Sequence, residues 1–194
     1  AMVRARFIAG NQQTGDNFIN MVKKFTYRPK LEYESIIQIS RLREKIEKDL
    51  AEEATKGKNV KLGYGGLADI EFSVQILQMM YGEKNNHLRE TNTLLAVAQL
   101  DALGIIDHKD SGNIKKNYLF LRNLECALRI QYISLMSHLP KEQEKLLMLA
   151  RFLKYSEKDS IDTVKKLLSD YAQTTKEIRV FYNKTIDVLL RTAL

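Results

Sequence analysis

The sequence predicts an all-α protein, an antiparallel bundle of long helices with a short extended, glycine-rich segment near its N-terminal third. The first observation is that 194 residues hold only two prolines and nine glycines, too few breakers for a many-turned β-protein. The second is a heptad-like seam whose members recur at steps of three and four. Its members are Ile161, Val164, Leu168, Tyr171, Thr175, Ile178, Tyr182, Thr185 and Leu189. A helix this long cannot stand alone, so it must lie along other helices.

The N-terminal region is expected to contain an extended piece and two helices. Residues 3–15 end in a polar, glycine-flanked stretch, which indicates an extended segment followed by a loop. A short helix then carries apolar residues at i, i+4 and i+7 and stops at Pro29. A longer helix over Tyr33–Thr55 is expected to pack on one side only, because its other faces are charged. The apolar positions are Phe18, Val22 and Phe25 in the short helix, and Ile36, Ile39, Leu42, Ile46 and Leu50 in the longer one.

The stretch Lys56–Gly66 contains four of the nine glycines, which indicates backbone that takes positive φ or passes close to another group. A short strand around Val60–Leu62 is one interpretation. The following segment, Leu67–Tyr81, fits helical spacing, yet residues 69–76 alternate polar and apolar as a strand does. Its length of fifteen residues and the glycine at position 82 favour a helix.

The remaining chain is predicted to be helical throughout. Thr91 or Asn92 is expected to cap a helix that runs to Leu103 and is closed by Gly104. Asp110 or Ser111 begins a long helix that reaches about Ser137. Pro140 suits the first turn of the next short helix, which ends near Tyr155.

Composition and charge exclude several classes of protein. The net charge is +7, but basic and acidic residues alternate, as in Arg41–Lys48, so a solvated mixed face is favoured and nucleic-acid binding is not expected. Cys126 is the single cysteine, which excludes an internal disulfide and is interpreted as a packing residue. No apolar run nears the roughly 20 residues that cross a bilayer, so no membrane association and a cytoplasmic location are expected. The three histidines are scattered and lack metal-ligand spacing.

The glycine-rich turn and the segment after it carry the clearest candidate chemistry. Lys61 precedes the turn, and Asp69 and Glu71 follow it in the first turn of the expected helix, whose N–H groups would favour an anion. The carboxylates either complement the helix dipole or help to hold Mg²⁺. On a helix they would point about 200° apart, so only one could face a shared metal, whereas a strand would point both the same way.

Several segments together resemble a known family. Residues 61–75, KLGYGGLADIEFSVQ, resemble the K-x-G-x-G-G-[IL]-x-D-I-E-F-x-V-Q signature of bacterial glutamine synthetase adenylyltransferases. Residues 4–11 (RARFIAGN), 88–94 (LRETNTL) and 118–125 (YLFLRNLE) resemble further elements of that family, in order. PII uridylyltransferases share the G-G-L-x-D turn but lack its continuation, so they are the second choice.

The resemblance implies an enzyme that transfers AMP from ATP to a tyrosine of glutamine synthetase, removes it by phosphorolysis, and responds to the PII signalling protein. It implies Mg²⁺ and ATP in the full-length enzyme, although folding is expected to need neither. Residues 1–66 would be the tail end of a nucleotidyltransferase core with connecting helices, and residues 67–194 a helical bundle domain. Lys61, Gly65, Gly66, Asp69 and Glu71 would lie near the nucleotide, with Asp69 and Glu71 as candidate metal ligands.

One departure from the family pattern limits this prediction. The G-S-x-x-D-x-D motif that binds Mg²⁺ in the family's core is missing from the sequence, and the chain begins Ala1-Met2-Val3. We therefore expect a piece of a longer protein that is inactive alone. The alternative is a non-catalytic helical module that docks PII or glutamine synthetase. Glu125 is expected to form an ion pair with Arg122 or Arg129 within its helix, and Arg89 to be a solvated loop residue.

Overall fold

The structure is a computed structural model that describes residues 2–29, 31–52, 58–132 and 137–193. Within these ranges it contains seven α-helices, two short 3-10 helices and no β-strand, so the all-α prediction is confirmed. The arrangement as an antiparallel bundle stays a prediction. The elements are η1 (Met2–Arg4), α1 (Gln12–Thr26), α2 (Tyr33–Glu52), α3 (Leu67–Tyr81), η3 (Asn86–Leu88), α4 (Thr93–Ala102), α5 (His108–Tyr132), α6 (Gln143–Phe152) and α7 (Ser160–Ala193).

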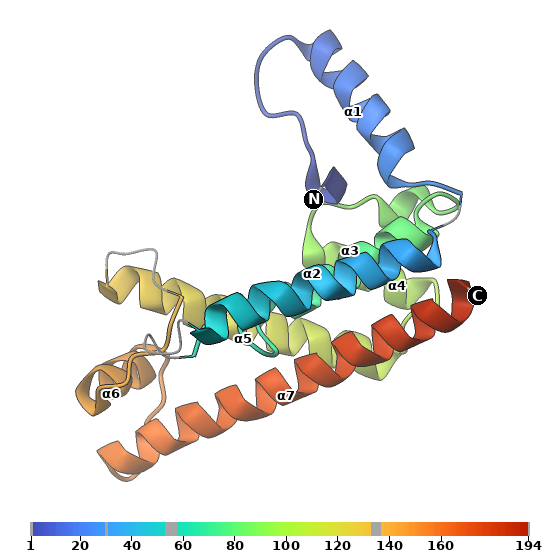
Figure 1. The fold of residues 1–194 in the computed structure, drawn as a ribbon. Helices are drawn as coiled ribbons and strands as arrows, with labels where there is room; N and C mark the ends of the chain where they lie inside the picture. The colour runs from blue at the N-terminus through green and yellow to red at the C-terminus, as the bar shows by residue number, and fades with distance from the viewer. Residues whose placement is uncertain (1, 30, 53–57, 133–136, 194) are drawn as a thin grey trace.

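The C-terminal helix α7 organises the packing. It has 34 residues and is therefore about 51 Å long. It contacts α2, α3, α5 and α6, and Figure 1 shows α2 and α7 as two long rods on the near side of the molecule. The seam predicted for this helix is buried from Val164 to Leu189, apart from the partly exposed Leu168. Its first member, Ile161, is 57% exposed, because it lies in the first turn, at the tip of the helix.

Helix α3 lies in the middle of the fold. It contacts α4, α5, α7 and η1, and its buried residues include the polar Asp69, Ser73 and Gln78. Burial on several sides explains the strand-like alternation of its sequence, because its polar residues meet partners inside the protein rather than solvent. The helical interpretation of Leu67–Tyr81 is confirmed, with the predicted Gly82 at the C-cap.

Helix α1 stands apart from the other helices and contacts mainly η1 (Figure 1). It begins at Gln12, within the stretch expected to be a loop, because the Asn11 side chain caps it by accepting a hydrogen bond from the Thr14 N–H at 3.0 Å. Of its predicted apolar face, Val22 is buried, but Phe18 and Phe25 are 47% and 65% exposed.

Several other boundaries differ from the predictions. No strand forms at Val60–Leu62, and the neighbouring Asn59 makes only an isolated antiparallel bridge to His138. Helix α5 begins at His108, two residues early, and Pro140 precedes α6 rather than lying in its first turn. Asn92 caps α4 as predicted, and Gly104 has a φ of +66°. The expected end of α2 at Thr55 lies outside the described residues, as does the side chain of Leu50.

Two side chains are placed opposite to expectation. Leu42, assigned to the buried face of α2, is 53% exposed, whereas its neighbour Arg43 is fully buried. Cys126, interpreted as a packing residue, is exposed on α5. Among the described helices, none combines the length and the apolar character that crossing a membrane requires.

Candidate functional site

The glycine-rich loop folds back onto the start of α3. The Asn59 side chain accepts hydrogen bonds from the Lys61 and Leu62 N–H groups at 2.9 and 2.8 Å, which closes the turn. The first N–H groups of α3, those of Leu67 and Ala68, donate to the carbonyls of Val60 and Lys61 at 3.1 and 2.9 Å. These N–H groups are therefore already used by the loop, and the expected anion site at this helix terminus does not form.

Gly65 and Gly66 let the loop approach α7 and α3 closely. Gly65 has a φ of +63°, and a Cβ there would overlap the Thr175 carbonyl oxygen of α7. A Cβ on Gly66 would lie 2.8 Å from the carbonyl oxygens of both Val60 and Lys61. Both glycines thus allow close backbone packing, and Gly65 also takes a positive φ, so both roles expected for this stretch occur.

Asp69 is fully buried and joins three other parts of the fold to α3. Its Oδ1 accepts from Arg43 Nε at 2.5 Å, and its Oδ2 accepts from the Gly65 N–H at 2.9 Å. Arg179 Nε of α7 lies 3.1 Å from the same Oδ2. Burial raises the pKa of Asp69, while the two arginines and the Gly65 N–H act in the opposite direction. Asp69 therefore holds α2, the loop, α3 and α7 together.

The two arginines of this inner cluster have further partners. Arg43 Nη2 donates to the Gly63 carbonyl at 2.8 Å, and its Nη1 lies 3.5 Å from Glu47 Oε2. Arg179 also pairs with Glu47, and its guanidinium lies over the exposed Tyr64 ring at 4.4 Å from the centroid. The carboxylates of Asp69 and Glu47 thus neutralise two arginines at the junction of α2 and α7.

The sequence contains a pattern that indicates the burial of Arg43, although Arg43 was not among the residues predicted for the buried face of α2. Ile36, Ile39, Arg43, Ile46 and Leu50 are spaced by alternating steps of three and four, which Leu42 does not fit. The spacing therefore indicates a buried side chain at position 43. The prediction placed Leu42 on the buried face instead, because arginine is charged. Arg179 was equally overlooked, although it directly follows the seam residue Ile178.

Glu71 points away from Asp69 and belongs to a second, outer cluster. Its Oε1 accepts from Arg122 Nη2 at 2.7 Å and lies 3.3 Å from Arg4 Nη1. Arg4 Nη2 also donates to Thr93 Oγ1 at 2.6 Å. Glu71 thus connects α3 to α5 and to η1.

The outer cluster continues along α5. Arg122 Nη1 donates to Glu125 Oε2 at 2.8 Å, and Arg129 Nη2 donates to Glu125 Oε1 at 2.9 Å. The predicted ion pairing of Glu125 is confirmed with both arginines. The hydroxyl of Tyr118 accepts from Arg122 Nε at 3.1 Å. This chain of contacts fixes the guanidinium of Arg122 between α3 and α5.

The two carboxylates of α3 do not form a shared metal site. Asp69 and Glu71 point to different sides of the helix, as two residues separated by i+2 must, and each is paired with arginines. In the ranges that the structure describes, no group of three or more His, Cys, Asp or Glu side chains could hold a metal ion. The donor set therefore does not fit Mg²⁺, because arginine-paired oxygens are poor ligands for a cation.

Two further candidates have simpler surroundings. Lys61 is half-buried, its backbone closes the loop, and no described residue bonds its ammonium group. Arg89 is not a merely solvated residue, because its guanidinium donates to the Gly82 and Glu83 carbonyls at 2.8 and 3.1 Å. It also lies 5.1 Å from the centroid of the Tyr27 ring.

Four of the sequence segments that carry the family resemblance meet at the outer cluster; residues 139–140 (LP) and 149–151 (LAR), which also resemble the family, do not take part in it. Arg4 comes from residues 4–11, Glu71 from residues 61–75, Thr93 from residues 88–94, and Arg122 with Glu125 from residues 118–125. Hydrogen bonds therefore join segments up to 89 positions apart directly, as between Arg4 and Thr93.

Comparison with known proteins agrees with this pattern. A family model described as GlnD PII-uridylyltransferase matches residues 37–186. The chain belongs to this family. Curated proteins that match the chain are named bifunctional glutamine synthetase adenylyltransferase/adenylyl-removing enzyme. The resemblance to the adenylyltransferases is thus confirmed. The family model takes its name from the PII uridylyltransferases, the second family considered from the sequence.

Three of these relatives illustrate the match. The protein of Hahella chejuensis is 31% identical over 144 residues, which cover 74% of this chain and 15% of the relative. The protein of Bartonella quintana is 32% identical over 162 residues, which cover 82% of this chain and 17% of the relative. The protein of Mycobacterium tuberculosis strain H37Rv is 31% identical over 154 residues, which cover 78% of this chain and 15% of the relative. The matched region thus spans between 15% and 17% of these family relatives.

Proposed function

We propose that this chain is the helical part of a glutamine synthetase adenylyltransferase, an enzyme that transfers AMP from ATP to a tyrosine of glutamine synthetase and removes it by phosphorolysis. The observation that carries the proposal is the convergence of the four family segments on the outer cluster of Arg4, Glu71, Thr93, Arg122 and Glu125. The names of the matched relatives support the same activity.

The proposal assigns ATP and Mg²⁺ to a nucleotidyltransferase core outside this chain, and it places the enzyme in the cytoplasm. Because the carboxylates of Asp69 and Glu71 are paired with arginines, we assign them a positioning role, not a metal-binding one. Asp69, Gly65 and Gly66 fix the loop, and the loop presents Lys61 and Tyr64 on its outer side. Lys61 is then the loop residue whose charge is available to a nucleotide phosphate.

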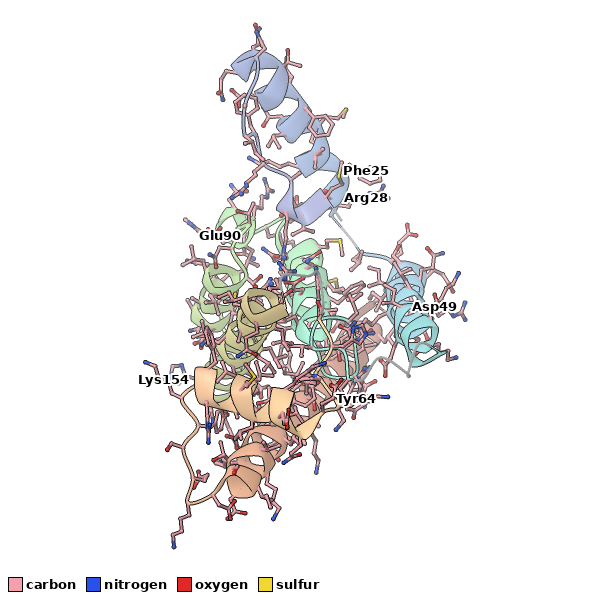
Figure 2. All side chains as sticks on the ribbon, turned by 90° about the vertical axis from the view of Figure 1, so that its left-hand side faces the viewer. Phe25, Arg28, Asp49, Tyr64, Glu90 and Lys154 are labelled. Atoms are coloured by element: carbon pink, nitrogen blue, oxygen red, sulfur yellow. The ribbon has the colours of Figure 1, made fainter. Side chains whose placement is uncertain are left out.

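The proposed division into residues 1–66 and 67–194 is supported by helix α1. Figure 2 shows α1 projecting from the body, with Phe25 and Arg28 at its base. Phe18, Met21 and Phe25 are 47%, 60% and 65% exposed, an apolar surface that an isolated helix would not keep in water. This surface is suited to packing against a catalytic core. Helix α2, by contrast, packs along α7.

The test of the activity uses the complete polypeptide in which this sequence occurs. It is incubated with Mg²⁺, α-labelled ATP and glutamine synthetase, and label on glutamine synthetase that inorganic phosphate then releases is the expected result. The 194-residue chain alone is the matched control and should transfer none. Transfer of UMP from UTP to PII in place of AMP transfer would contradict the proposal and favour a uridylyltransferase.

The alternative, a non-catalytic module that docks PII or glutamine synthetase, is favoured by the same exposed face of α1. It predicts that the 194-residue chain binds one of the two proteins directly in isothermal titration calorimetry. Phe25→Asp should abolish that binding, whereas Leu119→Asp, also at an exposed apolar residue but on α5, should not. Absence of binding to both proteins would exclude this alternative.

A further inference from the structure

A polar pocket lies beside the outer cluster. Its volume is about 430 Å³, and it is lined by Arg4 of η1 and the following Arg6, by residues 91–94 at the start of α4, and by Tyr118 of α5. This volume lies in the range of small-molecule sites, about 300–1,000 Å³. The two arginines are the only charged residues among the described residues that line it. The pocket is therefore electropositive.

Arg4 is held in place by groups of the protein. Its Nη2 donates to Thr93 Oγ1 at 2.6 Å and its Nη1 lies 3.3 Å from Glu71 Oε1, while a third of its side chain stays exposed. Glu71 is itself shared with Arg122, at 2.7 Å, so one carboxylate faces two guanidinium groups. The charge of Arg4 is consequently only partly neutralised.

Arg6 provides the second charge. It is exposed, and no described residue forms a hydrogen bond or an ion pair with its guanidinium. The carboxylate closest to the pocket along the chain, Glu90, accepts a hydrogen bond from the Asn92 N–H at 2.9 Å. Within the described chain, Arg6 thus faces the pocket without a competing acid.

The remaining lining groups are neutral and suited to hydrogen bonding. Thr91 and Thr93 contribute hydroxyls, and Asn92 contributes an amide whose oxygen is occupied by the Leu94 and Leu95 N–H groups. The free guanidinium fork of Arg6, the remaining N–H groups of Arg4 and the flanking hydroxyls match the tetrahedral oxygens of a phosphate, which arginine binds in bidentate fashion. A carboxylate ligand would use only the fork of Arg6.

We propose that this pocket binds the phosphate group of a small phosphorylated ligand. The site is separate from the glycine-rich loop, and the inference does not rest on the proposed transferase activity. Either inorganic phosphate or a phosphate monoester such as a nucleotide could supply the group, and the test distinguishes them.

The test is isothermal titration calorimetry of the 194-residue chain at constant ionic strength with sodium phosphate, AMP and adenosine. Saturable phosphate binding is expected, with none for adenosine. Equal affinity for AMP and phosphate would identify the phosphate group alone as the ligand, and tighter AMP binding would identify a nucleotide.

The variant is Arg6→Gln, and the matched control is Arg191→Gln, at an exposed arginine of α7 that does not line the pocket. Loss of one charge-assisted hydrogen bond should weaken phosphate binding about tenfold or more in Arg6→Gln. Arg191→Gln should bind as the unsubstituted chain does. Unchanged binding in Arg6→Gln, equal weakening in both variants, or no saturable binding would overturn the proposal.

Discussion

Replacing Arg43 with methionine tests the buried ion pair that joins α2 to the glycine-rich loop and α3. The substitution keeps a long, unbranched side chain but removes the hydrogen bonds to Asp69 Oδ1 at 2.5 Å and to the Gly63 carbonyl at 2.8 Å. Asp69, fully buried, is then left with Arg179 as its charged partner. Removing one member of a buried pair costs about 3–5 kcal/mol, because the other charge stays buried.

The assay is urea unfolding followed by circular dichroism. With a slope of about 2 kcal/mol per molar urea, a loss of about 3–5 kcal/mol lowers the midpoint by roughly 1.5–2.5 M. Arg41→Met is the matched control, because Arg41 is exposed on the same helix two residues earlier. Its free energy of unfolding should change by less than about 0.5 kcal/mol. Equal effects of the two substitutions would refute the buried ion pair.

The same variant makes a prediction about pH. Burial raises the pKa of Asp69 and Arg43 opposes that rise, so removing Arg43 places the folded-state pKa further above the unfolded value of about 3.9. A carboxyl with a raised folded pKa loses stability as pH increases from its unfolded pKa through its folded pKa. The cost of Arg43→Met should therefore be smaller at pH 4 than at pH 7. A cost independent of pH would show that Asp69 is not the group left unpaired.

Three further predictions concern individual positions. Gly65→Ala should lower the melting temperature several degrees more than Gly104→Ala, since both have positive φ (+63° and +66°) but only at Gly65 would a Cβ meet α7; equal shifts would contradict this close approach. Glu125→Gln should lower the free energy of unfolding in urea by about 1.5–3 kcal/mol, because two arginine hydrogen bonds to a buried carboxylate are weakened. The control Glu144→Gln, at an exposed glutamate, should lower it by less than about 0.5 kcal/mol. Burial raises the pKa of Tyr171 to about 12, so the difference in absorbance between the unsubstituted chain and Tyr171→Phe should show its ionisation near that pH. The unsubstituted chain should lose stability above pH 10, because the tyrosine ionises there first in the unfolded state. Ionisation of Tyr171 near pH 10 would refute its burial.

Much of the local structure followed from the sequence. The helical class, the last helix and the limits of α3 follow from spacing and glycine placement, because helix periodicity and C-capping act over a few residues. The cap at Asn92 and the ion pairs of Glu125 are local as well, since their partners lie within four residues. Even the divergence of Asp69 and Glu71 follows from helical geometry once α3 is known to be a helix.

Partners distant in sequence were decided only by the tertiary structure. Spacing along α2 separates the buried Arg43 from the exposed Arg41, but only the tertiary structure shows that Arg43 meets Asp69, 26 positions away. In the same way, nothing local to Arg4 shows that it meets Glu71 and Thr93, and Cys126 gave no local sign of its exposure. The physical reason is that burying a charge is favourable only where the whole fold delivers a counter-charge. The sequence alone therefore determined the helices and the family resemblance, while tertiary packing decided which of its many charged residues are buried pairs and which line a pocket.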